Sequence, residues 1–89
     1  MARFEISAPE LATMAERQPN PEGLFQLGMA YANGDEVDVD LVAAHKWFNL
    51  AAQRGYADAA WHRQQIAEEM TSSQIAAAQR AAREWLSLH

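Results

Sequence analysis

The apolar residues of this chain recur every three to four positions, which is the spacing that gathers side chains on one face of an α-helix. The first such stretch follows Ser7, which forms the pattern of a capping box with Glu10. Three apolar residues then stand at i, i+3 and i+4: Leu11, Met14 and Ala15. The pattern predicts a helix over residues 8–18, broken by Pro19 and Pro21.

A second helix is predicted to start immediately after this break. Asn20 is a favourable N-cap and Pro21 suits the first helical position. The residues expected on the buried face are Leu24, Phe25, Leu27, Gly28 and Tyr31. The pair Asn33–Gly34 is expected to end the helix, because glycine accepts the left-handed conformation that follows a helix C-terminus.

A short loop and a third helix follow. In the loop from Asp35 to Val39, Val37 is the residue expected to turn inward, and Asp40 is expected to cap the next helix. The buried face of that helix is predicted to carry Ala44, Trp47, Phe48 and Ala51. We expect Gly55 to end it.

Two further helices complete the pattern. The fourth is predicted from about Ala57 to Met70, and Thr71 with Gln74 forms a second capping box at the start of the last. Apolar residues recur in that last helix at helical spacing: Ile75, Ala78, Ala82, Trp85 and Leu86. The chain is therefore predicted to be all-α, with about five helices joined by short connections.

The sequence also repeats itself. A shift of 36 residues aligns three pairs: Phe25 with Trp61, Gln26 with His62, and Met29 with Gln65. A shift of 38 residues aligns four more: Ala44 with Ala82, Trp47 with Trp85, Phe48 with Leu86, and Leu50 with Leu88. A period of 36–38 residues with two helices per period is typical of an α-solenoid.

One stretch of this repeat resembles a known family. The residues that carry the resemblance are Leu27, Gly28, Tyr31, Gly34, Val37, Asp40, Ala44, Trp47, Phe48, Ala51, Ala52, Gly55 and Ala59. Their spacing resembles that of the Sel-one-like repeat, a relative of the tetratricopeptide repeat, at about residues 21–57. The chain departs from the family at Glu36, where the family usually has a second loop glycine.

The resemblance implies an α-solenoid of antiparallel helix pairs in one domain, residues 1–89. A capping helix over residues 8–18 would precede a full repeat at 21–55. Residues 57–88 would form a degenerate or capping pair, which keeps Ala82 and Trp85 but has Arg63 and Gln64 in place of the Leu-Gly pair.

Composition and charge exclude several classes of protein. The chain has 89 residues, a net charge of −5 and no cysteine, so it offers neither disulfides nor a thiolate zinc site. It lacks the basic cluster of a nucleic-acid-binding protein and an apolar run long enough to span a membrane. We expect a cytoplasmic protein. Residues 1–40 carry a net charge of −6, and the loop Asp35–Asp40 is either a solvated loop or a docking edge for a basic partner.

Candidate chemistry is sparse. His62 and Asp58 stand at i and i+4 on one predicted helix, a spacing more typical of an ordinary surface pair than of a metal site. The acidic loop resembles the opening of a calcium loop, but Leu41 and Trp47 occupy the positions that need Gly and Glu. We therefore expect no catalytic residue, no metal and no cofactor, and predict that the protein is not an enzyme.

The resemblance instead implies a small adaptor or scaffold that presents a helical surface to a peptide or protein partner. The first helix of each pair tends to line the concave side of such superhelices. The hypothetical contact residues, expected to point away from the core, are Gln26, Met29, His62 and Gln65. Trp61 is either a binding anchor or, as its alignment with Phe25 favours, a packing residue between repeats.

Two alternatives to the adaptor remain open at this stage. The chain could assemble into a homodimer or cap the helical array of another protein, because a solenoid generally needs about three repeats to be stable. A small hydrolase-like enzyme using His62 and a carboxylate is less favoured, since no residues stand at catalytic spacing.

Overall fold

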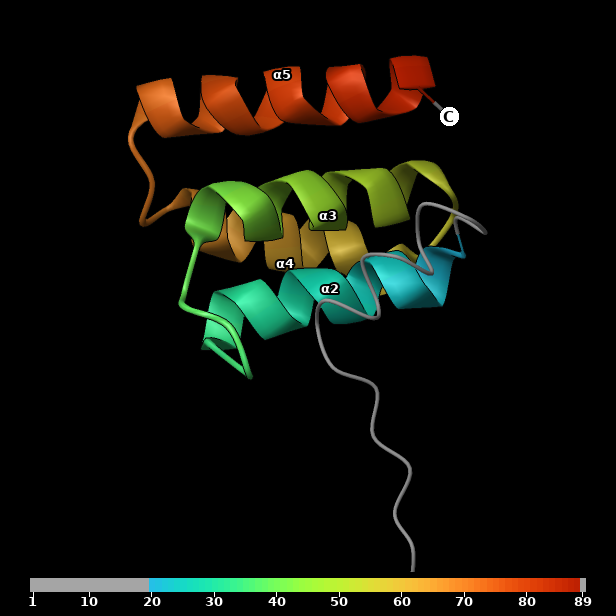
Figure 1. Cartoon of the computed structure of the whole chain (residues 1–89), viewed down its shortest axis with the longest axis horizontal. Helices are drawn as coiled ribbons and strands as arrows, with labels where there is room; N and C mark the ends of the chain where they lie inside the picture. Colours follow the sequence, from blue (N-terminus) through green and yellow to red (C-terminus); the bar gives the residue numbers. More distant parts are fainter. Residues whose placement is uncertain (1–19, 89) are drawn as a thin grey trace, which may run out of the picture.

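The computed structural model describes residues 20–88, which form four α-helices and no strand. The helices are α2 (Pro21–Asn33), α3 (Leu41–Gln53), α4 (Ala57–Ala67) and α5 (Ser72–Leu88). Successive helices run in opposite directions (Figure 1). The all-α prediction is confirmed for this part of the chain, while the helix expected over residues 8–18 lies outside the described residues.

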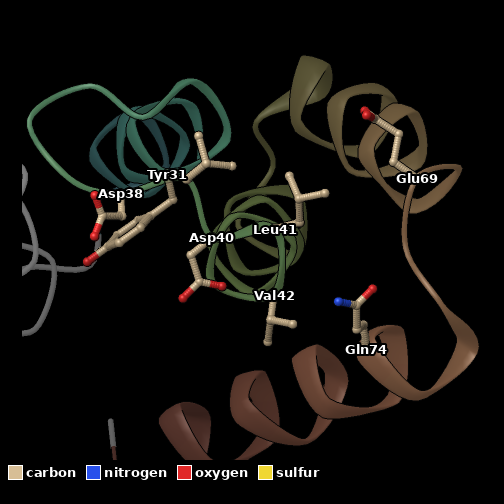
Figure 2. Close-up of a pocket in the computed structure, with 8 residues that line it drawn as sticks. Tyr31, Asp38, Asp40, Leu41, Val42, Glu69 and Gln74 are labelled. Atoms are coloured by element: carbon tan, nitrogen blue, oxygen red, sulfur yellow. The ribbon is translucent and has the colours of Figure 1, made fainter.

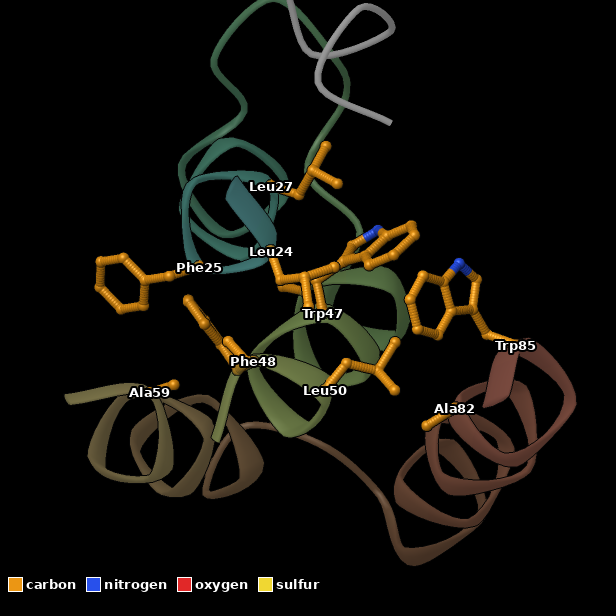
Figure 3. Close-up of a cluster of buried hydrophobic side chains, with 11 residues drawn as sticks. Leu24, Phe25, Leu27, Trp47, Phe48, Leu50, Ala59, Ala82 and Trp85 are labelled. Carbon is orange, nitrogen blue, oxygen red and sulfur yellow. The ribbon is translucent and has the colours of Figure 1, made fainter. Parts of the chain in front are cut away.

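Helix α3 lies at the centre and contacts α2, α4 and α5. Figure 3 shows the three outer helices arranged around it. The buried cluster consists of Leu24, Phe25, Leu27, Ala44, Trp47, Phe48, Leu50, Ala51, Ala59, Ala82 and Trp85. Eight of the fifteen residues of the repeat pattern, counting Ala82 and Trp85 with the thirteen that carry the resemblance, are members of this cluster, so the sequence pattern identified most of the core.

Local capping bonds fix the starts of three helices as expected. The side chain of Asn20 accepts hydrogen bonds from the backbone N–H groups of Glu22 and Gly23, at 2.8 and 3.2 Å. Asp40 accepts one from Ala43 at 3.0 Å. At α5 the capping box is reciprocal, since Thr71 N–H donates to the Gln74 side chain and Gln74 N–H donates to Thr71 Oγ1.

Gly28 allows α2 and α3 to approach closely. A Cβ atom placed there would lie 2.9 Å from Phe48 Cγ and closer still to two other carbons of that ring. Phe48 is fully buried, so the ring has no free space into which it could move. The glycine of the repeat pattern is therefore required by packing.

The loop between α2 and α3 adopts the left-handed conformation twice. Gly34 ends α2 with φ 70°, as expected from the Asn33–Gly34 pair, and Glu36 has φ 63°. A side chain at the second position costs free energy that glycine would avoid. The departure of Glu36 from the family pattern thus falls on a position whose backbone favours glycine. Val37 is half-buried, as predicted, while Val39 is 59% exposed.

Helix α4 is shorter than predicted. It was expected to extend to about Met70 but ends at Ala67. The N–H groups of Glu69 and Met70 bond to carbonyls three residues earlier, at Ile66 and Ala67, so the last turn tightens. The capping box at Thr71 then starts α5 in a new direction, and the intervening residues cannot continue α4.

Four further residues of the repeat pattern occupy one buried, one half-buried and two exposed positions. Gly28 is buried within α2, and Tyr31 is half-buried. Gly55 follows α3 with φ 94°, in keeping with the expected helix end. Asp40 is exposed and serves as the cap described above.

Candidate interaction surface

An aromatic cluster joins α2, α3 and α4. The ring of Phe25 stacks on Tyr56 at a centroid distance of 4.4 Å and meets His62 edge-on at 5.1 Å. His62 also stacks on Phe48, at 5.5 Å. In Figure 3, Phe25 projects from α2 toward the side on which α4 lies. These contacts link the first helices of the two predicted repeats through their side chains.

The structure separates the four predicted contact residues into two kinds. Gln26 on α2 and Gln65 on α4 are exposed, as expected. Met29 is half-buried against the core, and His62 is half-buried among the aromatic rings. The expectation that Met29 and His62 point away from the core is therefore wrong, because both fill space at helix junctions. A role for the four residues in partner binding stays a prediction.

Trp61 is the large aromatic residue most exposed among residues 20–88, at 61%. Its ring meets His62 edge-on at 5.0 Å, so it lies beside the aromatic cluster without entering it. The packing role favoured for Trp61 by its alignment with Phe25 is not what the structure shows, since Phe25 is only 8% exposed. An exposed Trp on a helix is the kind of residue that dominates the binding energy of protein interfaces.

The difference in exposure between Trp61 and Phe25 is part of a wider difference between the two predicted repeats. Phe48 and Leu50 are fully buried, whereas their equivalents Leu86 and Leu88 are 37% and 80% exposed. Helix α3 is covered by three other helices, whereas α5 packs mainly against α3. Among the described residues, one side of α5 is therefore not covered by another helix.

A pocket of about 530 Å³ lies where the acidic loop meets the turn between α4 and α5. Figure 2 shows Tyr31 and Asp38 at one end, Asp40 and Val42 between, and Gln74 toward the other. Three of its described lining residues are carboxylates and none is a cation. Its charge suits the docking-edge interpretation of the acidic loop, and Val39 adds exposed apolar surface.

No cluster of three potential metal ligands occurs among residues 20–88. His62 and Asp58 form no ion pair or hydrogen bond there, since the imidazole is turned to the aromatic rings. The surface pair of His62 and Asp58 that their spacing favours is therefore not formed.

Sequence reasoning missed one polar site, formed by His45 and Arg63. His45 is only 4% exposed, and its burial together with the charge of Arg63 lowers its pKa below the usual 6.5. Arg63 donates from Nη1 to Asn49 Oδ1 at 2.6 Å. The signal available in the sequence was the i, i+4 spacing of His45 and Asn49 on one helix.

In comparisons with known proteins, no family model, no curated protein and no solved structure matches this chain. Within residues 20–88, no helix has both the length and the apolar character needed to cross a membrane.

Proposed function

We propose that this chain is a non-enzymatic protein–protein interaction module, built as a short α-solenoid that resembles Sel-one-like repeats. The observation that carries the proposal is the contact between repeat-equivalent residues. Trp47 on α3 and Trp85 on α5 meet edge-on at 6.1 Å, and their equivalent neighbours Ala44 and Ala82 are both buried. Helices of successive pairs that pack through equivalent positions are what a solenoid requires.

The proposed binding surface spans α2 and α4. The two helices both pack on α3 and touch each other through Phe25 and His62, and they expose the side chains of Gln26, Gln65 and Trp61. Rigid helices hold contact residues at little entropic cost when a partner binds. The half-buried Met29 and His62 would serve mainly to shape this surface.

The test selects peptide ligands for the full 89-residue chain from a random peptide library and compares two double variants. Gln26→Arg with Gln65→Arg places two bulky charges on the proposed surface, while Gln79→Arg with Ser87→Arg places two on α5. All four positions are exposed, so circular dichroism should show unchanged helicity in both variants. We expect at least a tenfold loss of affinity in the first variant and little change in the second. Equal affinities of the two variants would show that the surface lies elsewhere.

A homodimer or a cap on a longer helical array is the second candidate, and the open side of α5 favours it. Leu88 is 80% exposed at the position equivalent to the fully buried Leu50, so a further helix covering α5 would bury it. Light scattering after size exclusion distinguishes the candidates. A dimer that dissociates when Leu88 is replaced by Glu (Leu88→Glu) would support self-assembly. A protein that stays monomeric at all concentrations would contradict self-assembly and favour the adaptor.

A further inference from the structure

A second, smaller pocket lies between α3 and α4, away from the acidic loop. It has a volume of about 300 Å³, which is the lower limit of typical small-ligand sites. Its described lining residues are His45, Arg63, Gln64, Ala67 and Glu68. The pocket therefore combines one positive and one negative charge with neutral polar groups.

The guanidinium of Arg63 is held in place but not neutralised. Its Nη1 donates to Asn49 Oδ1 at 2.6 Å, and this amide carries no charge. Arg63 forms no ion pair within residues 20–88, although the carboxylate of Glu68 lines the same pocket. A guanidinium has five N–H donors arranged to match a carboxylate, and most of them remain available.

The residue that α3 contributes to the pocket, His45, has a polar atom without a hydrogen-bond partner among the described residues. His45 is 96% buried, being 4% exposed, and its Nδ1 atom has no hydrogen-bond partner among the described residues. A buried polar atom without a partner costs roughly 1–3 kcal/mol. Since burial and the Arg63 charge lower the pKa of His45, the ring is neutral near pH 7 and can either donate or accept a hydrogen bond.

We propose that this pocket binds a free α-amino acid through its zwitterionic head group. The carboxylate of the ligand would pair with Arg63, and its ammonium group would pair with Glu68. Two opposite charges that line one pocket without pairing with each other complement a ligand that carries both charges on one carbon. A bare anion would be repelled by Glu68 and a bare cation by Arg63.

The experiment titrates the full chain, isotopically labelled, with each of the twenty standard amino acids and follows the NMR signals of Ala67 and the His45 ring. Acetate and methylammonium serve as the two halves of the head group. We expect at least one amino acid to bind with a dissociation constant of roughly millimolar or below. Each half should bind at least tenfold more weakly. Absence of shifts with every amino acid, or equal binding of acetate alone, would overturn the proposal.

Two pairs of variants then test which residue binds each charge of the ligand. Glu68→Gln should weaken amino-acid binding at least fivefold, whereas Glu69→Gln, an exposed neighbour that does not line this pocket, should leave it unchanged. Arg63→Gln should abolish binding, with Arg80→Gln on α5 as its matched control. If Glu68→Gln and Glu69→Gln bind equally, the head-group assignment is wrong. The site is separate from the proposed α2–α4 binding surface, so either proposal can fail without the other.

Discussion

The hydrogen atom that takes the place of a side chain at Gly28 sets how closely α2 approaches α3. A methyl group there would overlap the ring of Phe48, which is fully buried. Overpacking of this kind typically costs 1–3 kcal/mol, and the better helix propensity of alanine recovers up to about 1 kcal/mol. Because the overlap is with an aromatic ring that cannot move away, we expect Gly28→Ala to destabilise the protein by about 2 kcal/mol, measured by urea unfolding.

Gly23 on the same helix is the matched control. A Cβ atom there would meet only the Cβ of Asn20, at an ordinary 3.9 Å. Gly23→Ala should therefore leave stability unchanged or raise it by about 0.5–1 kcal/mol, through helix propensity alone. If both variants lost the same stability, the contact with Phe48 would not be the reason for glycine at position 28.

His45 gives the stability of the protein a pH dependence. The folded state lowers the pKa of His45, chiefly through burial and secondly through Arg63, so the unfolded chain takes up a proton more readily. The contribution of neutral His45 is complete above the unfolded pKa of 6.5 and is lost as the pH falls through the lowered folded value. The free energy of unfolding of the wild type should thus decrease between pH 7.5 and 5.

The variant His45→Gln isolates this effect, because glutamine has no proton to gain in that range. Its unfolding free energy should fall less than that of the wild type between the two pH values, whatever its absolute stability. The other titrating groups contribute equally to both proteins. Parallel pH profiles would mean that His45 does not couple protonation to folding.

At the scale of the helices, the capping box of α5 is where sequence and structure agree most directly. Thr71 and Gln74 exchange two hydrogen bonds, of 2.9 and 3.1 Å, that satisfy backbone donors at the helix start. Thr71→Ala should destabilise the protein by about 1 kcal/mol. Ser73→Ala, at an exposed neighbour, should change stability by less than about 0.5 kcal/mol. Thermal unfolding of both variants measures the difference.

Helix starts could be predicted from the sequence because a cap is a local interaction between residues two or three apart. The orientation of Trp61 could not, since it depends on which face of α4 meets α3. Only Ala59 of α4 is buried, and its apolar residues are spread around the helix. The pattern therefore gave no single buried face. The His45–Arg63 pocket was missed for the same reason, because it requires two helices in a particular rotation.

At the scale of the whole molecule, α5 is attached to the rest of the fold mainly through one large side chain. It packs mainly against α3, and Trp85 is its largest buried side chain, at 5% exposure. The ring of Trp85 meets Trp47 edge-on, and the guanidinium of Arg54 lies 5.6 Å from the centre of the Trp85 ring. A helix that buries one large side chain is expected to open at a lower free energy than α2 and α3, which share most of the buried cluster.

Trp85→Ala should therefore cost about 3–5 kcal/mol and act first on α5. In native-state hydrogen exchange, the amides of α5 should lose protection in this variant while those of α2 and α3 lose less, because these two helices share the core around Leu24, Leu27 and Phe48. Leu86→Ala, next to Trp85 but 37% exposed, is the control and should cost about 1 kcal/mol or less. A uniform loss of protection over all four helices would mean that residues 20–88 unfold as one cooperative unit. In that case the ends of this helix array would be as stable as its centre, and a partner covering α5 would not be needed to hold it in place.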